Sequence, residues 1–352
     1  MSAREGRGGR PLRIAQVAPP LEVVPPSGYG GTERIVGELV VELVRRGHDV
    51  TTFASGDSSV PGRLVPTVPV ALRALGFADD PADAYEQTVE LVLAQQDAFD
   101  VIHAHLDPWN LELARRARIP VVSTFHRRLD QSWTRGAFRG RPRGLVAVSG
   151  DQARMHPEAE WTVIHHGVTF RPPPRPEVSG DDFCFVGRMS PEKGFPDAIE
   201  VARLTGRPLL VATKTPHGRD EIDYHEQVIR PLLDRADVTI LGELTEADRD
   251  RLVAGSRASL VPSAWPEPFG LVVIEALGCG TPVLARRVGG IPEILRDGID
   301  GFVGDDAQQL AFLDDRLDDL DRAAIQAAAI ERFSVGRMVD EYEALYRQLL
   351  AE

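Results

Sequence analysis

Two cationic residues, Arg188 and Lys193, lie in the segment Gly187–Gly194 between an apolar run and a helical pattern. This placement predicts a turn from a strand into a helix. Two cations in such a turn can contact one phosphate from two sides, and the N-terminus of the helix behind them adds N–H donors. The competing interpretation is a solvated turn, because Arg and Lys are common at loop tips.

Two carboxylates, Glu267 and Glu275, are separated by seven residues. Pro266 and Pro268 predict an irregular loop around Glu267, and the residues from Leu271 onward predict a helix. The N–H groups at the start of that helix are expected to face the same ligand as Glu267, and carboxylates suit a ligand rich in hydroxyl groups. These N–H groups belong to Phe269, Gly270, Leu271 and Val272. For Glu275, an ordinary exposed helix residue is the competing interpretation.

Together the two motifs resemble the donor-site signature of retaining glycosyltransferases of family 4. The matching residues are Gly-Arg-x-Ser-x-Glu-Lys-Gly at 187–194 and Glu-x7-Glu at 267–275. The similarity continues through Gly289–Glu293 to Gly301 and Phe302. The resemblance implies an α/β protein of the GT-B fold, with two Rossmann-like domains facing a central cleft. It also implies a C-terminal helix that crosses back to the first domain.

The same resemblance implies roles for individual residues. Arg188 and Lys193 are expected to bind the donor diphosphate, with Gly187 in the same turn. Glu267 is expected to contact the transferred sugar, and Glu275 the ribose hydroxyls. Leu244 closes the segment that matches the one near the nucleotide base. Lys214, just past a predicted strand, is a candidate for a third cation in the donor site.

The first half carries weaker signals, of which a glycine loop at 28–33 is the first. As a dinucleotide fingerprint it fails, because Glu33 stands where the third glycine is required. It resembles the flexible loop of family 4, in which Gly30 and Gly31 lie over the donor phosphates and the acceptor. The resemblance also places His126 at the active site near the transferred sugar, although a lone histidine after a strand is more often structural.

Arginines gather between Arg127 and Arg143, with Asp130 as the opposing charge. A solvated excursion is the favoured interpretation, and an anionic acceptor or a lipid surface is the alternative. The candidate acceptor-binding residues are Tyr29, His105, Arg127 and Arg128. A zinc site could use three histidines, His103, His105 and His126, but no acidic or cysteine ligand has matching spacing. We therefore expect no metal and no cofactor.

Short apolar runs alternate with helical periods along the chain, which predicts parallel sheets built from βαβ units. The predicted strands are Leu12–Ala18, Val50–Ala54, Val101–Ala104, Val121–Thr124 and Leu145–Val148 in the first half, and Phe183–Val186, Leu209–Ala212, Val238–Leu241, Ala258–Val261 and Pro282–Ala285 in the second. The proline-rich stretch near residues 171–182 is the predicted linker. The predicted parts are a disordered tail (1–10), an N-terminal acceptor-binding domain (11–170), the linker (171–182), a C-terminal nucleotide-sugar-binding domain (183–334), and a helix packing on the first domain (335–352).

The net charge of −13 over 352 residues argues against a nucleic-acid-binding protein. Two cysteines suggest a reducing compartment, and no apolar run reaches the roughly 20 residues of a membrane span. The expected location is cytoplasmic, with peripheral membrane contact left open.

The predicted function is transfer of a sugar from a nucleotide-diphosphate donor, with retention at the anomeric carbon. A UDP-sugar is favoured and a GDP-sugar is the alternative. The acceptor and the oligomeric state are not specified by the sequence. Three other functions are weighed against transfer: a sugar phosphorylase, a nucleotide-sugar epimerase, and a non-catalytic nucleotide-sugar sensor or scaffold.

Overall fold

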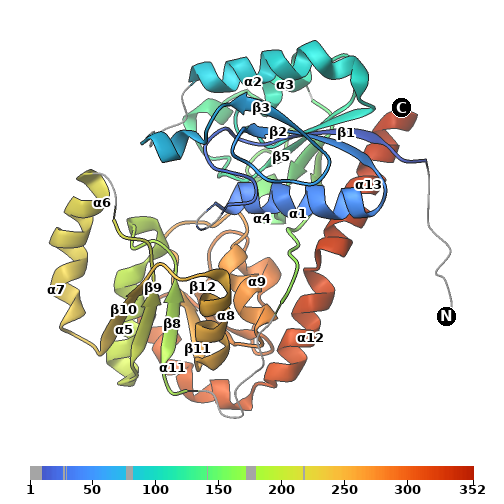
Figure 1. Ribbon diagram of the computed structural model, residues 1–352. Helices are drawn as coiled ribbons and strands as arrows, with labels where there is room; N and C mark the ends of the chain where they lie inside the picture. The colour runs from blue at the N-terminus through green and yellow to red at the C-terminus, as the bar shows by residue number, and fades with distance from the viewer. Residues whose placement is uncertain are drawn as a thin grey trace. The chain divides into compact units, whose positions relative to one another are not determined.

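The chain forms two α/β units, each built on one parallel sheet (Figure 1). The computed structural model describes residues 10–26, 28, 30–76, 82–140, 142–171, 180–216 and 219–352. The first unit comprises Met1–Val148, Met155–Val168 and Val335–Glu352, and the second comprises Ser149–Arg154 and Thr169–Ser334. Most of the predicted tail (1–9) and of the predicted linker (172–179) lies outside the described residues.

The first sheet has seven strands in the order β3-β2-β1-β4-β5-β6-β7, all paired in parallel. Its central strands are buried along their length, because helices cover both faces of the sheet. The strands are β1 (Arg13–Val17), β2 (Asp49–Ser55), β3 (Arg63–Val68), β4 (Val101–Ala104), β5 (Val121–Phe125), β6 (Leu145–Ala147) and β7 (Trp161–Val163).

Four helices flank this first sheet: α1 (Gly31–Arg45), α2 (Ala82–Gln95), α3 (Asn110–Arg116) and α13 (Val335–Ala351). Figure 1 shows α2 and α3 on one face of the sheet and α1 on the other. The C-terminal helix α13 packs against α1. Arg46, directly after α1, donates to Asp340 and Glu343 of α13 at 2.6 Å each, so charge as well as apolar burial ties α13 to this unit.

The second sheet has six parallel strands in the order β10-β9-β8-β11-β12-β13. The strands are β8 (Phe183–Val186), β9 (Leu209–Ala212), β10 (Val238–Gly242), β11 (Ala258–Val261), β12 (Val283–Arg286) and β13 (Gly301–Gly304). The helices are α4 (Gly150–Arg154), α5 (Phe195–Thr205), α6 (Arg219–Tyr224), α7 (Arg230–Leu233), α8 (Glu246–Gly255), α9 (Leu271–Gly278), α10 (Ile291–Ile294), α11 (Ala307–Phe312) and α12 (Arg322–Arg332). A π-helical turn, His225–Ile229, separates α6 from α7.

The bounds of β4, β8, β9 and β11 are those expected from their apolar runs. Three strands were not predicted, namely β3, β7 and β13, and all three are edge strands. Strand β3 contains a proline and is only partly buried, and β7 has three residues that are mostly exposed. Edge strands lack the continuous apolar run that identifies a central strand.

The segment Ser149–Arg154 belongs to the second unit, although it falls within the predicted range of the first domain. This segment is bound to the second unit by the carboxylate of Glu293, which accepts hydrogen bonds from the N–H groups of Gly150 at 2.7 Å and Asp151 at 2.6 Å. These donors lie at the start of α4, where N–H groups have no partner within the helix.

In both sheets the strand order reverses beside the first strand of the unit. The reversal lies between β1 and β4 in the first sheet and between β8 and β11 in the second. Loops at the carboxyl ends of strands diverge at such a point, which is where open α/β sheets bind ligands.

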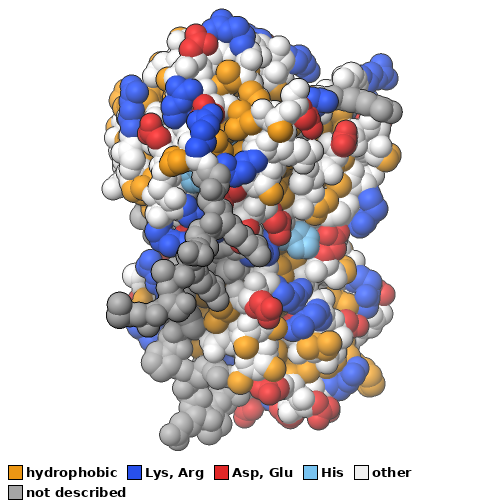
Figure 2. Space-filling view, turned by 90° about the vertical axis from the view of Figure 1, so that its right-hand side faces the viewer, with side chains coloured by type: hydrophobic (Ala, Val, Ile, Leu, Met, Phe, Trp, Pro, Cys, Tyr) orange, Lys and Arg blue, Asp and Glu red, His pale blue; other side chains and the backbone are white. Residues whose placement is uncertain are grey.

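On the face drawn in Figure 2, acidic and basic side chains are intermixed, and apolar atoms occur in small groups. Many arginines are paired with neighbouring carboxylates, as Arg203 is with Glu200 and Arg230 with Glu226. No helix within the described ranges is long and apolar enough to cross a membrane.

Candidate functional site

The predicted donor-binding residues of the second unit include a group at the strand reversal of its sheet. Arg188 and Lys193 follow β8, and Ser263 and Glu267 follow the adjacent strand β11. Because the strands are parallel, both loops leave the sheet at the same edge. A short 3₁₀ helix, Pro191–Lys193, and Gly194 connect the first loop to α5.

Gly194 is required by close packing between these two loops. Its φ is +66°, and a Cβ atom there would lie 1.8 Å from the carbonyl oxygen of Pro262. The N–H of Ala264 also donates to the carbonyl oxygen of Glu192 at 2.9 Å. The β8 and β11 loops are therefore held directly against each other.

Lys193 and Glu267 form an ion pair across this contact. Lys193 Nζ lies 2.6 Å from Glu267 Oε1, which also accepts from Ser263 Oγ at 3.0 Å. Glu267 is buried, and Lys193 keeps about a quarter of its side chain exposed. The pair holds a cation at the rim of the site and a carboxylate beneath it.

Arg188 is held between two carboxylates that the sequence did not single out. Its guanidinium donates to Glu192 at 2.8 Å and to Glu221 at 3.1 Å. Glu192 lies in the same loop, four residues on, and its side chain is mostly buried. Glu221 comes from α6, and its side chain is 37% exposed. The four-residue spacing between Arg188 and Glu192 could have predicted their ion pair from the sequence, whereas nothing in the sequence indicated Glu221.

The remaining candidates of this unit lie at the ends of neighbouring strands. Lys214 follows β9 and Leu244 follows β10, and both side chains are half-buried. Gly187 follows β8 directly, and its N–H donates to the carbonyl oxygen of Ala212. These residues therefore share one edge of the sheet with Arg188.

Helix α9 begins at Leu271, as expected, with Gly270 as its N-cap at φ +100°. Leu271 and Val272 are half-buried in its first turn. The side chain of Phe269 is buried against Phe333, with ring centroids 6.2 Å apart, so it belongs to the core. Only the backbone of Phe269 is therefore a candidate for ligand contact.

Glu275 has a cationic neighbour within the second unit. Arg249 of α8 lies 3.6 Å from its carboxylate, and Arg249 also donates to Asp250 at 2.8 Å. Burial alone would lower the pKa of Arg249, but Glu275 and Asp250 raise it above its ordinary value.

In the first unit His126 follows β5 and is held through its backbone. Asp107 Oδ2 accepts the N–H of His126 at 2.7 Å and the N–H of Arg127 at 3.0 Å. Asn110 donates to the other oxygen of Asp107 at 3.0 Å. Asp107 and Asn110 are buried, so this clamp fixes the turn after β5. Neither Asp107 nor Asn110 is part of a motif that the sequence reveals.

The histidines of this unit form a cluster. His105 Nδ1 lies 2.8 Å from His126 Nε2, and the rings of His126 and His166 stack at 5.1 Å. Burial, together with the charge of Arg127, lowers the pKa of His126 to about 3. Burial and the neighbouring rings lower the pKa values of His105 and His166 well below the ordinary value. All three rings are therefore neutral at physiological pH.

The glycine loop precedes α1. Gly30 is buried, and a Cβ atom there would meet Pro26 at 2.9 Å, whereas Gly31 is exposed in the first turn of the helix. Tyr29 lies outside the described residues. Burial raises the pKa of Glu33, in the same turn, to about 7.

The arginine-rich excursion is organised around an aromatic core. Phe138 is buried, and it packs with Trp133 against Phe125. Phe125 and Phe138 therefore belong to the core of this unit, and Trp133 is partly buried against them. Arg127 is exposed, whereas Arg128 is paired with Asp130. Arg141 lies outside the described residues.

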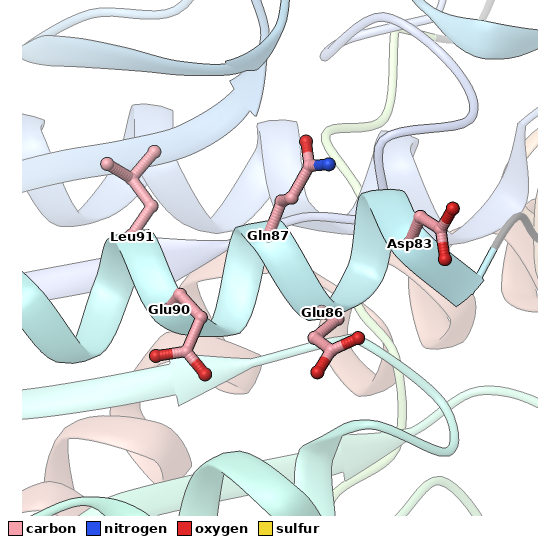
Figure 3. A pocket seen from close by; sticks show the side chains of 5 residues that line it. All are labelled: Asp83, Glu86, Gln87, Glu90 and Leu91. Carbon is pink, nitrogen blue, oxygen red and sulfur yellow. The ribbon is translucent and has the colours of Figure 1, made fainter.

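A shallow pocket of about 580 Å³ lies on α2, and none of the candidate site residues lines it. Its side chains come from that helix alone: Asp83, Glu86, Gln87, Glu90 and Leu91 (Figure 3). Glu90 is already paired with Arg116 at 2.6 Å. Among the described residues, no group of three or more His, Cys, Asp and Glu side chains is arranged to hold a metal ion.

Two family models match the chain in succession. Residues 29–170 match Glycosyltransferase Family 4, and residues 170–320 match Glycosyl transferases group 1. A D-inositol 3-phosphate glycosyltransferase of Mycobacterium avium (strain 104) is 30% identical, over 98% of this chain and 96% of that protein.

Solved structures agree with these matches. AviGT4, a glycosyltransferase involved in avilamycin A biosynthesis, is 26% identical with a TM-score of 0.71, covering 97% of this chain and 98% of that one. Anabaena Alr3699/HepE, in complex with UDP and glucose, shares the fold at 21% identity and a TM-score of 0.69, covering 95% of this chain and 98% of that one.

Removal of the Asp107 clamp is expected to destabilise the first unit. In Asp107→Ala the part-buried N–H groups of His126 and Arg127 lose their acceptor, which should lower the free energy of unfolding by about 2 kcal/mol. Chemical denaturation followed by circular dichroism measures this. Asp97→Ala is the control, because Asp97 is 80% exposed in a surface pair with Arg118. Equal stability of the two variants would contradict the assigned role.

Proposed function

Because this chain belongs to glycosyltransferase family 4 and has the GT-B fold, we propose that its second unit binds a nucleotide-diphosphate sugar at the β8–β11 edge. The chain is a glycosyltransferase, and we propose which of its residues perform the transfer. One observation carries it: Lys193 and Glu267 meet at 2.6 Å where the strand order reverses.

The diphosphate occupies the cationic side of this edge. Lys193 and Arg188 contact its oxygens, and the N-terminus of α9, from Gly270 to Val272, adds N–H donors. Lys214 supplies a third cation from the end of β9. These groups stabilise the negative charge that grows on the diphosphate as its bond to the sugar breaks.

Glu267 orients the transferred sugar. A carboxylate can accept about four hydrogen bonds, and the two from Lys193 and Ser263 both reach Oε1. Oε2 therefore has capacity for a sugar hydroxyl. Glu275 accepts from the ribose hydroxyls, and Leu244 lies near the base. We favour UDP as the nucleotide, as in the complexes of Alr3699/HepE.

The first unit supplies the acceptor side, through His126, the Gly30–Gly31 loop and Arg127. In the transfer the bond from the anomeric carbon to the diphosphate oxygen breaks, and the acceptor oxygen bonds to that carbon. The acceptor proton passes to the leaving diphosphate. Both events occur on the same face of the sugar, which retains the configuration. The positive charge comes from Arg188 and Lys193, so the proposed reaction needs no metal ion.

Lys193→Ala is expected to lower kcat by at least about 100-fold, because one preorganised charge is lost from the transition state. It should also weaken binding of nucleoside diphosphates, which a thermal-shift panel of UDP, GDP and ADP measures. Arg203→Ala is the matched control, since Arg203 is an exposed cation of α5 paired with Glu200. Undiminished transfer by a folded Lys193→Ala protein would sink the proposal.

Glu221→Gln is expected to strengthen binding of a nucleoside diphosphate by about 2- to 5-fold. Arg188 is held by two carboxylates, and the exposed one on α6 competes with the incoming phosphate. Titration calorimetry with UDP measures the change. Glu226→Gln removes the same charge from a residue that pairs with Arg230 and should bind as the wild type does. Weaker binding by Glu221→Gln would show that Glu221 assists the site.

The product is expected to keep the anomeric configuration of the donor, as same-face attack requires. NMR of the purified product, using the coupling of its anomeric proton, distinguishes the two configurations. Incubation with donor alone serves as the control for epimerisation. A product of inverted configuration is incompatible with the proposed mechanism.

A further inference from the structure

A hydrogen-bonded chain runs through the interior of the first unit from α13 to His126. Tyr346 of α13 lies 2.7 Å from His103 Nδ1 and accepts from Gln16 Nε2 at 3.3 Å. Gln16 Oε1 lies 3.0 Å from His105 Nε2, and His105 Nδ1 lies 2.8 Å from His126 Nε2. Gln16, His103 and His105 are buried, so within the unit these groups bond to one another rather than to solvent.

Each imidazole in this chain carries one proton. Burial lowers the pKa of His126 to about 3, with a contribution from Arg127, and the pKa values of His103 and His105 are also well below the ordinary value. A neutral imidazole has one nitrogen that donates and one that accepts. Every contact between two rings must therefore join a protonated nitrogen to a bare one.

The Gln16 amide sets the donor-to-acceptor direction of this series of hydrogen bonds. Its carbonyl oxygen can only accept, so His105 Nε2 is protonated and His105 Nδ1 is bare. The bare Nδ1 then accepts from His126 Nε2–H. We infer that Gln16 and His105 are positioning residues that hold His126 as its Nε2–H tautomer, with Nδ1 presented as a hydrogen-bond acceptor.

The contacts at the other end of this series of hydrogen bonds, around Tyr346 and His103, agree with this direction. Gln16 Nε2, which can only donate, also lies 3.2 Å from His103 Nδ1, so this nitrogen is bare and accepts from the Tyr346 phenol as well. His103 therefore carries its proton on Nε2 and donates to Thr124 Oγ1 at 2.8 Å. Burial, together with the neighbouring Tyr342, raises the pKa of Tyr346 well above the ordinary value, which keeps its hydroxyl protonated. Turning the Gln16 amide by 180° would reverse every one of these steps.

A bare Nδ1 restricts what His126 can bind. It accepts a hydrogen bond from a hydroxyl group and repels a phosphate oxygen, which is also an acceptor. His126 is therefore matched to a hydroxyl of the transferred sugar or of the acceptor, not to the diphosphate. This consequence rests on the proposed function, whereas the tautomer does not.

NMR of the full chain labelled with ¹⁵N-histidine tests the tautomer, because two-bond couplings distinguish a protonated ring nitrogen from a bare one. The wild type should show His126 with Nε2 protonated and Nδ1 bare. Gln16→Met removes the acceptor for His105 and should give a mixture of tautomers or the opposite one. Gln16→Glu restores an acceptor and should restore the Nε2–H form. A protonated Nδ1 in the wild type overturns the inference, as does a tautomer that Gln16→Met leaves unchanged.

Kinetics separate positioning from a general structural role. Gln16→Met is expected to lower kcat about 10-fold, since a misplaced group near the reacting atoms is costly, while UDP affinity stays as in the wild type. Gln16→Glu should recover most of the loss. Tyr342→Phe is the control: it removes a buried hydroxyl of the same helix that bonds Thr124 and lies off the Gln16–His105–His126 line. An equal loss of kcat in Tyr342→Phe contradicts a specific role for Gln16.

The two proposals fail separately. If His126→Ala transfers sugar at the wild-type rate while the NMR tautomer is as inferred, His126 lies outside the transfer site and the positioning role for catalysis falls. If the tautomer is wrong while Lys193→Ala abolishes transfer, the donor-site proposal stands and this inference falls.

Discussion

Parallel pairing of β8 with β11 is the constraint on which the chemistry of this protein depends. It sends two loops that are about 75 residues apart in sequence out of the same edge of the sheet, at the point where the strand order reverses. The hydrogen bond from Ala264 to Glu192 and the absence of a side chain at Gly194 hold these loops together. The contact between Lys193 and Glu267 follows from that arrangement.

The cations at this edge are paired with carboxylates before any ligand arrives. Arg188 and Lys193 face Glu192, Glu221 and Glu267, so the cations are already oriented by carboxylates. A ligand with phosphate oxygens must take over part of this bonding. To bind, the ligand must offer Arg188 stronger acceptors than Glu221 does. The partly exposed side chain of Glu221 can then bond to water instead.

In the first unit the candidate site is built from neutral groups instead of charged ones. Burying charged imidazoles among apolar strands would be costly, and the histidines avoid that cost by remaining neutral and bonding to each other and to Gln16. Because neutral rings must alternate donors and acceptors, one amide orientation is transmitted along the whole chain. The two candidate sites thus use different electrostatics: ion pairs around Lys193 and Glu267 in the second unit, and directed neutral hydrogen bonds around His105 and His126 in the first.

The sequence by itself determined the α/β class, the central strands and the family. A central parallel strand such as β8 is a short, wholly apolar run, and the turn that carries Arg188 and Lys193 is local. Only the tertiary structure decided which groups these residues contact. Glu221 reaches Arg188 from another helix, Glu293 draws Ser149–Arg154 into the second unit, and Gln16 meets Tyr346 across 330 residues. Periodicity reports the environment of one segment, whereas a hydrogen bond between distant segments depends on the packing of both, and that packing exists only in the folded chain.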